Sequence, residues 1–103
     1  MLINGKEVKF YFSIWAKTEW DNYILANKEK AISFAMMQLA FIMNEAAIRA
    51  GMGGEKLVPE DLEDLPARVY DQITEELKAQ MEADSKTTIE TKEPAGKKTK
   101  NPR

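Results

Sequence analysis

The most apolar stretch of the chain, residues 31–43, is interrupted only by Ser33 and Gln38. It is shorter than the roughly 20 residues that a membrane-crossing helix needs. We therefore expect it to lie within a buried helix over residues 28–50. Apolar residues occupy most of the circumference of this helix until the polar pair Asn44–Glu45. Such a helix is surrounded by protein rather than covered on one side.

The N-terminal residues predict a β-hairpin over residues 1–13. Asn4–Gly5 tolerates the positive φ angles that a two-residue type I′ turn requires. After this turn, Val8, Phe10 and Phe12 alternate with charged or polar residues, which predicts a strand with one apolar face. A lone hairpin is only marginally stable in water, so this face must cover the helices or another subunit.

Local signals mark the ends of the first two predicted helices. Ser13 is placed to cap a helix over residues 14–26, which contains no glycine or proline. Residues 51–54 contain three glycines. Glycine suits a left-handed helix cap, so we expect the long helix to end there and a flexible joint to follow.

The C-terminal part predicts one more amphipathic helix. Pro59 opens a short helical turn, and Asp64 then caps a helix over residues 65–83 whose apolar residues recur every three or four positions. The fold class is therefore α+β, predominantly helical, with one small domain over residues 1–84. Residues 85–103 contain a single large hydrophobe, and we expect them to form a disordered charged tail.

Charge is distributed unevenly along the chain, although the formal net charge is only -2. Residues 55–84 carry ten acidic and three basic side chains, whereas residues 85–103 carry six basic and two acidic ones. The basic segment has no aromatic residue for base stacking and follows an acidic domain that repels phosphate. We therefore expect no nucleic-acid partner, and the short apolar run of residues 31–43 predicts no membrane partner. The N-terminus also lacks the apolar core of a secretory signal, which predicts a cytoplasmic protein.

The residue inventory excludes several kinds of chemistry. The chain contains no cysteine and no histidine, so it has no disulfide, no thiolate or imidazole zinc ligand and no Ser-His-Asp relay. Asp71 and Glu75 lie away from the apolar stripe of their helix, on its solvent side, where their proton affinities are not tuned for catalysis. We expect no catalytic residue, no cofactor and no enzyme activity.

Two further motifs also have plainer explanations than ligand binding. The acidic side chains within residues 60–64 lack the alternation and central glycine of a calcium loop, and acids ahead of a helix are stabilised by its macrodipole. We expect a solvated helix start there and no metal site. The glycines of residues 51–54 follow a helix and lack the Gly-Lys-Ser/Thr ending of a phosphate-binding loop.

Large apolar residues are abundant for a domain of this size, so part of this surface is expected to contact another chain. Methionine serves both as core filler and as adaptable binding surface, and tryptophan commonly anchors interfaces. Each of these side chains could equally belong to the core. The residues that we expect to bind a partner protein are Phe10, Phe12, Trp15, Trp20, Met36 and Met37.

The order of these features resembles the tail assembly chaperones of long-tailed bacteriophages and prophages. The resemblance covers residues 2–83: a strand pair with the sequence Ile-Asn-Gly-Lys-Glu-Val-Lys-Phe, then helices, then an acidic helix led by proline and a charged tail. It implies a small helical protein of the host cytoplasm, absent from the mature virion, that self-associates. It also implies that the protein binds the tape measure protein, a long amphipathic helical client, and keeps it soluble during tail morphogenesis.

Two other functions remain open at this stage. One is a structural or adaptor subunit that stays in the finished tail, which the protein content of purified virions would reveal. The other is a small regulator that binds nucleic acid through the basic segment of residues 85–103; its binding would weaken steeply with salt and be lost when that segment is removed.

Overall fold

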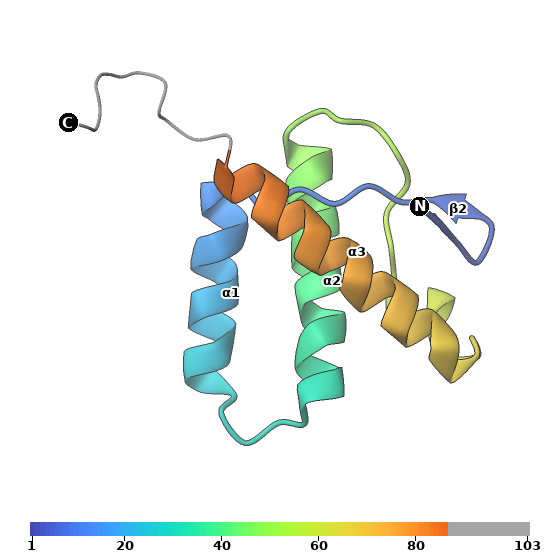
Figure 1. Ribbon diagram of the computed structural model, residues 1–103, viewed down its shortest axis with the longest axis horizontal. Helices are drawn as coiled ribbons and strands as arrows, with labels where there is room; N and C mark the ends of the chain where they lie inside the picture. Colours follow the sequence, from blue (N-terminus) through green and yellow to red (C-terminus); the bar gives the residue numbers. More distant parts are fainter. Residues whose placement is uncertain (87–103) are drawn as a thin grey trace.

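The computed structural model describes residues 1–86 of the chain. Two short strands precede three α-helices in the described part, which confirms the predicted α+β, predominantly helical class. In Figure 1, α1 and α2 lie side by side and α3 crosses them at a steep angle. The elements are β1 (Leu2–Ile3), β2 (Lys6–Glu7), α1 (Ile14–Ala26), α2 (Ile32–Arg49), a 3₁₀ turn η1 (Pro59–Asp61) and α3 (Ala67–Lys86).

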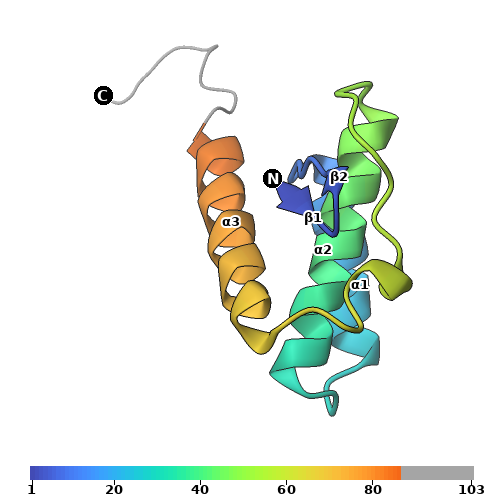
Figure 2. The ribbon, with the colours of Figure 1, turned by 90° about the vertical axis from the view of Figure 1, so that its right-hand side faces the viewer.

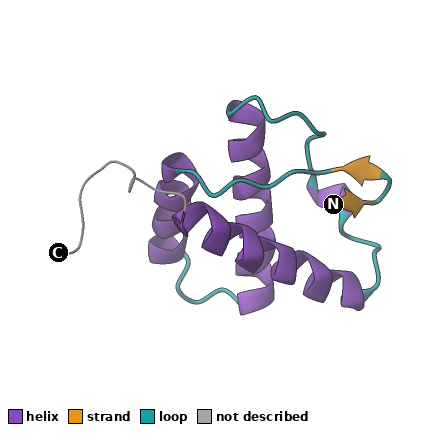
Figure 3. Cartoon of the chain, turned by 45° about the horizontal axis from the view of Figure 1, so that its top comes forward, coloured by secondary structure: helices purple, strands orange, loops and turns teal. Residues whose placement is uncertain are grey.

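The N-terminal hairpin forms with the predicted turn but with shorter strands. β1 and β2 pair antiparallel, and the two turn residues Asn4 and Gly5 have φ angles of 51° and 82°, as a type I′ turn requires. Hydrogen bonds between the two arms reach only to Val8, which exchanges two with Met1, so the expected strand up to residue 13 is wrong. Residues 8–13 instead form an irregular segment (Figure 3), in which the Tyr11 N–H donates to the carbonyl of Met43 in α2, at 3.0 Å.

The alternation of this segment was nevertheless informative about burial. Val8 and Phe10 expose 0% and 4% of their surface, and Phe12 packs partly buried against the same core. Figure 2 shows the N-terminal part of the chain between α2 and α3. The apolar face thus covers helices, because a side-chain alternation can be satisfied by any extended segment that lies across a core.

α1 has the predicted bounds and the predicted cap. The Ser13 Oγ accepts a hydrogen bond from the Ala16 N–H at 3.0 Å, while the Ser13 backbone is extended. This bond satisfies one of the N–H groups that a helix start leaves without an intrahelical partner. At the other end, the Asn27 N–H donates to the Ile24 carbonyl.

α2 begins four residues later than expected. Residues 28–31 belong to the connection that reverses the chain, and the Lys30 N–H closes a turn on the Asn27 carbonyl at 3.1 Å. Ala31 is extended, with ψ of 150°, so the helix starts after it. The helix starts late because α1 and α2 pack side by side, and two adjacent helices in this arrangement need a connecting loop between them.

The C-terminus of α2 is the expected glycine cap. Gly51 has φ of 76°, its N–H donates to the Ile48 carbonyl, and the Met52 N–H donates to the Ala47 carbonyl. This pair of bonds defines a Schellman motif, in which only glycine adopts the left-handed conformation without strain. The predicted helical turn after Pro59 is also present, as η1.

α3 starts at Ala67, directly after Pro66, rather than at residue 65, and it extends through the predicted domain boundary to Lys86. Its apolar stripe is confirmed, because Ile73 and Leu77 expose 1% and 0% of their surface. The predicted disordered tail otherwise falls on residues 87–103, which lie outside the described residues.

The main core lies between α2, α3 and the N-terminal segment. α2 is therefore not surrounded, contrary to expectation: Ile32 and Phe34, near its start, expose 71% and 47% of their surface. The buried residues of the core cluster are Ile3, Val8, Phe10, Leu39, Ala40, Met43, Leu57, Ile73 and Leu77.

Candidate protein-binding groove

α2 presents two different faces. One faces the core and carries Leu39 and Met43, which are 2% and 0% exposed. At 100° per residue, Phe34, Phe41 and Glu45 fall on the opposite side of the helix. None of these three is buried, and Phe34 is among the large exposed apolar residues. An apolar face of α2 is thus left without a full cover.

A hollow of about 560 Å³ lies along the first half of this face. Its volume is within the range of ligand-binding clefts, and most of its lining is apolar. The far wall comes from η1, the residues after it and the start of α3. Its lining includes Phe34, Met37 and Phe41 from α2, and Pro59, Leu62, Glu63 and Tyr70 from the far wall.

A second hollow of about 320 Å³ continues along the second half of the face. It shares Phe41 and Pro59 with the first, and its other lining residues include Trp15, Glu45 and Lys56. We call the two adjoining hollows the α2 groove. From Ser33 to Glu45 it follows α2 over 13 residues, which corresponds to a rise of about 18 Å, or about three helical turns.

Asn44 holds the chain segment that leads into the far wall of the groove. Its side chain is 2% exposed and bonds only backbone groups. The amide nitrogen donates to the carbonyls of Lys9 (3.2 Å) and Glu55 (3.1 Å), and the amide oxygen accepts from the Leu57 N–H (2.8 Å). One polar side chain on α2 therefore ties together the N-terminal segment and the loop that precedes Pro59.

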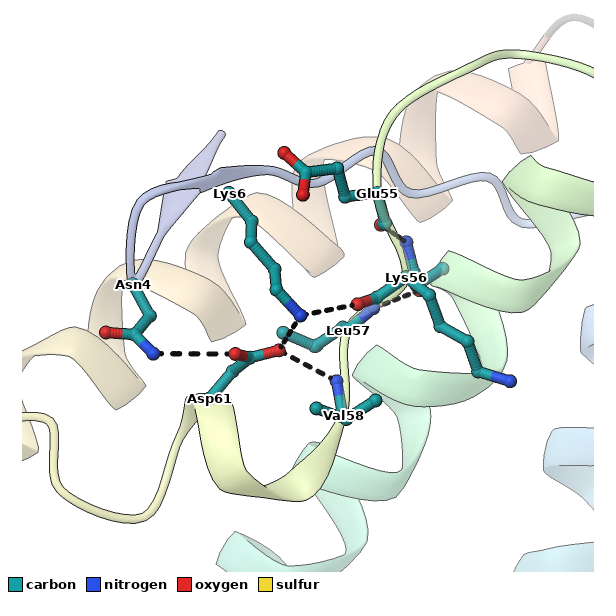
Figure 4. A network of polar contacts seen from close by, with 8 residues as sticks. Asn4, Lys6, Glu55, Lys56, Leu57, Val58 and Asp61 are labelled. Carbon is teal, nitrogen blue, oxygen red and sulfur yellow. Dashed lines mark hydrogen bonds and ion pairs between the residues drawn. The ribbon is translucent and has the colours of Figure 1, made fainter.

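Asp61 fixes the η1 turn itself (Figure 4). Its carboxylate accepts hydrogen bonds from the Val58 N–H (3.0 Å), the Lys6 ammonium (2.9 Å) and the Asn4 side-chain amide (3.4 Å). The Val58 bond, followed by those from Lys6 and Asn4, lowers the pKa of Asp61 below its ordinary value. The Lys6 ammonium also donates to the Lys56 carbonyl at 3.2 Å.

This arrangement corrects the expectation that the acids of residues 60–64 are all solvated. Asp61 is 6% exposed and holds η1 to the hairpin. One local signal could have found it: an acid at the third position of a helical turn that begins with proline can reach back to the N–H of the capping residue, here Val58. Glu60, Glu63 and Asp64 are exposed, as expected.

The structure divides the six predicted contact residues into core and surface. Phe10 is a core residue, so its predicted role as a surface contact is wrong. Phe12, Trp20 and Met36 are partly buried and pack against the core. Trp20 also stacks on Tyr23, with ring centroids 5.9 Å apart.

The other two predicted residues line the α2 groove. Met37, which is partly buried and also packs against the core, lies in the first hollow, and Trp15 lies in the second. The Trp15 ring also holds the Arg49 guanidinium 4.4 Å from its centroid, a cation–π contact. Phe34, Phe41, Leu62 and Tyr70 are the main groove residues that the sequence reasoning missed. Their spacing was visible, but which face of α2 stays open depends on where the other elements pack.

Comparisons with protein-family models, with curated proteins and with solved structures found no match. Within residues 1–86, none of the helices combines the length and hydropathy required to cross a bilayer. The same residues contain no group of three or more acidic side chains arranged to hold a metal ion.

Proposed function

We propose that this protein is a non-catalytic assembly chaperone that binds an amphipathic helix of a client protein in the α2 groove. The observation that carries the proposal is the open apolar face of α2, bounded by Trp15 on one side and by Pro59 and Leu62 on the other. A groove of this kind receives the apolar face of a helix, with anchors at i, i+3, i+4 and i+7.

The resemblance to phage tail assembly chaperones supplies the client. The tape measure protein is a long helical chain with apolar faces, and a protein that covers them keeps the chain soluble before the tail tube forms around it. Self-association would let successive copies cover successive segments. A role in the host cytoplasm, rather than in the finished particle, follows from this proposal. Stoichiometric presence in purified tails would instead indicate an adaptor subunit.

The affinity expected from the groove can be estimated from Phe34. Its side chain is 47% exposed. A phenylalanine side chain has about 200 Å² of surface, so about 100 Å² is left for a partner. At about 25 cal/mol per Å², covering that area contributes about 2.5 kcal/mol, and losing most of it changes Kd about 30-fold.

The proposal is tested with a fluorescently labelled amphipathic peptide of about 14 residues, the length that covers the groove. We expect saturable binding by fluorescence anisotropy, weakened about 30-fold by Phe34→Ala. Ile14→Ala is the matched control, because Ile14 is 88% exposed and lines neither hollow. Equal losses for both variants, or no binding at all, would contradict a client site in the groove. Soluble co-expression with a tape measure protein tests the identity of the client.

A further inference from the structure

We propose that the helix bound in the α2 groove carries lysine or arginine along one border of its apolar stripe. This inference rests on the proposed function and specifies the chemistry of the client. The partner is therefore a cationic amphipathic helix, rather than any apolar helix that fits the groove.

The far wall of the groove carries negative charge that no nearby cation in the described part of the chain compensates. Glu63 lines the first hollow, and Glu60 and Asp64 lie beside lining residues in the chain. All three are exposed, and within residues 1–86 none has a cation within 4.0 Å, whereas Asp61 is paired with Lys6. From residue 57 to residue 77 the sequence has seven acidic side chains and one basic one, Arg68.

The cations beside the groove have other partners. The Arg49 guanidinium lies 4.4 Å from the Trp15 ring centroid, and Lys56, in the loop that leads to η1, lies 3.9 Å from Glu45. At the other end of the groove, the Lys30 ammonium lies 5.4 Å from the Phe34 ring centroid. The negative charge of Glu60, Glu63 and Asp64 is therefore left uncompensated by the described residues on the η1 side. A bound helix that places lysine or arginine there gains complementary contacts, and one with glutamate there meets like charge.

The border of the groove is exposed, so each ion pair contributes only a factor of about 1.5 to 5 in affinity. Two such pairs together change Kd about tenfold. The preference must also weaken as salt rises, because exposed charges are screened over about 10 Å at moderate ionic strength. The apolar contacts do not share this salt dependence, which separates the two contributions.

The test uses three helical peptides with the same apolar stripe and with lysine, glutamine or glutamate along one border. We expect the lysine peptide to bind about tenfold more tightly than the glutamine peptide at low salt, and the glutamate peptide to bind more weakly than either. The triple variant Glu60→Gln, Glu63→Gln, Asp64→Asn should abolish this preference. The matched control is Glu19→Gln, Glu29→Gln, Glu75→Gln, which removes three exposed acids that neither line the groove nor adjoin a lining residue in the chain.

The possible outcomes separate this inference from the proposed function. Equal binding of all three peptides would overturn the charge preference and leave the client groove intact. No binding of any peptide would overturn both. A lysine peptide with a scrambled apolar stripe that binds as well as the original would also overturn the inference, because charge alone would then explain binding. The inference would also be overturned if the wild type formed a dimer that excludes the peptides and Phe34→Ala converted this dimer to a monomer. A second copy of the chain would then be the occupant of the groove.

Discussion

Replacing Asn44 with alanine should destabilise the fold more than most single substitutions. Its side chain makes three hydrogen bonds to backbone groups, and none can be replaced by a methyl group. At about 1 kcal/mol each, their loss amounts to about 3 kcal/mol. The Leu57 N–H is left buried without a partner, which adds about 1 kcal/mol or more. The total of about 4 kcal/mol is a large part of the 5–15 kcal/mol that stabilises a small domain.

The assay is urea unfolding followed by tryptophan fluorescence, combined with hydrogen exchange of the Leu57 amide. Asn44→Ala should shift the unfolding midpoint to lower urea and speed the exchange of this amide. Asn44→Asp keeps an acceptor for the Leu57 N–H and loses both donors, so that amide should stay protected even though the variant is destabilised. Asn22→Ala, at an exposed position of α1, is the control and should change stability by less than about 0.5 kcal/mol.

A loss below about 1 kcal/mol in Asn44→Ala, with the Leu57 amide still exchanging slowly, would refute this reasoning. It would mean that the loop before Pro59 is held in place by apolar packing alone. If the reasoning is right, folded Asn44 variants should also bind the peptide more weakly, because the far wall of the α2 groove is no longer held in place.

Three other substitutions have clear expectations. Hydrogen bonds lower the pKa of Asp61, so its stabilising contribution is present at neutral pH and is lost as pH falls through the folded-state pKa. In urea unfolding, the stability advantage of the wild type over Asp61→Asn should therefore shrink below about pH 4. Tyr23→Phe should raise Tm, since the Tyr23 hydroxyl is buried and unbonded in the described structure and its removal is worth about 1 kcal/mol. Gly54→Ala should lower Tm more than Gly51→Ala. Both glycines have positive φ, but only the Cβ of an alanine at position 54 would lie 3.2 Å from the backbone oxygen of Glu7. Equal losses at the two glycines would show that backbone strain alone matters.

The elements that the sequence predicted well depend on neighbouring residues. Asn4–Gly5 determines the hairpin turn, Ser13 the start of α1 and Gly51 the end of α2, because each acts through its own backbone angles or through a hydrogen bond to a nearby N–H. The apolar stripe of α3 was equally clear, since one helix has one periodicity. These signals were sufficient for the fold class, for both ends of α1 and for the C-terminus of α2.

The groove could not be derived in this way. Trp15 and Met37, which line the groove, were predicted as contact residues, but Phe10 was assigned to the same set although it is buried in the core. Trp15, Met37 and Phe10 are all apolar. Residue type alone does not distinguish a side chain that another segment covers from one that lies beside the open face of α2. Separating them requires knowing where the N-terminal segment crosses α2.

What the sequence by itself determined about this protein is therefore its local structure: the turns, the caps and the amphipathic character of each helix. The tertiary structure alone decided that residues 8–13 cross the helices without pairing as a strand, that Asp61 is buried against Lys6, and that one side of α2 stays open. The physical reason is that these features depend on contacts between residues far apart in the chain, such as Lys6 and Asp61, which are 55 positions apart, and Phe12 and Asp84, which are 72 positions apart. Local backbone preferences carry no information about such contacts.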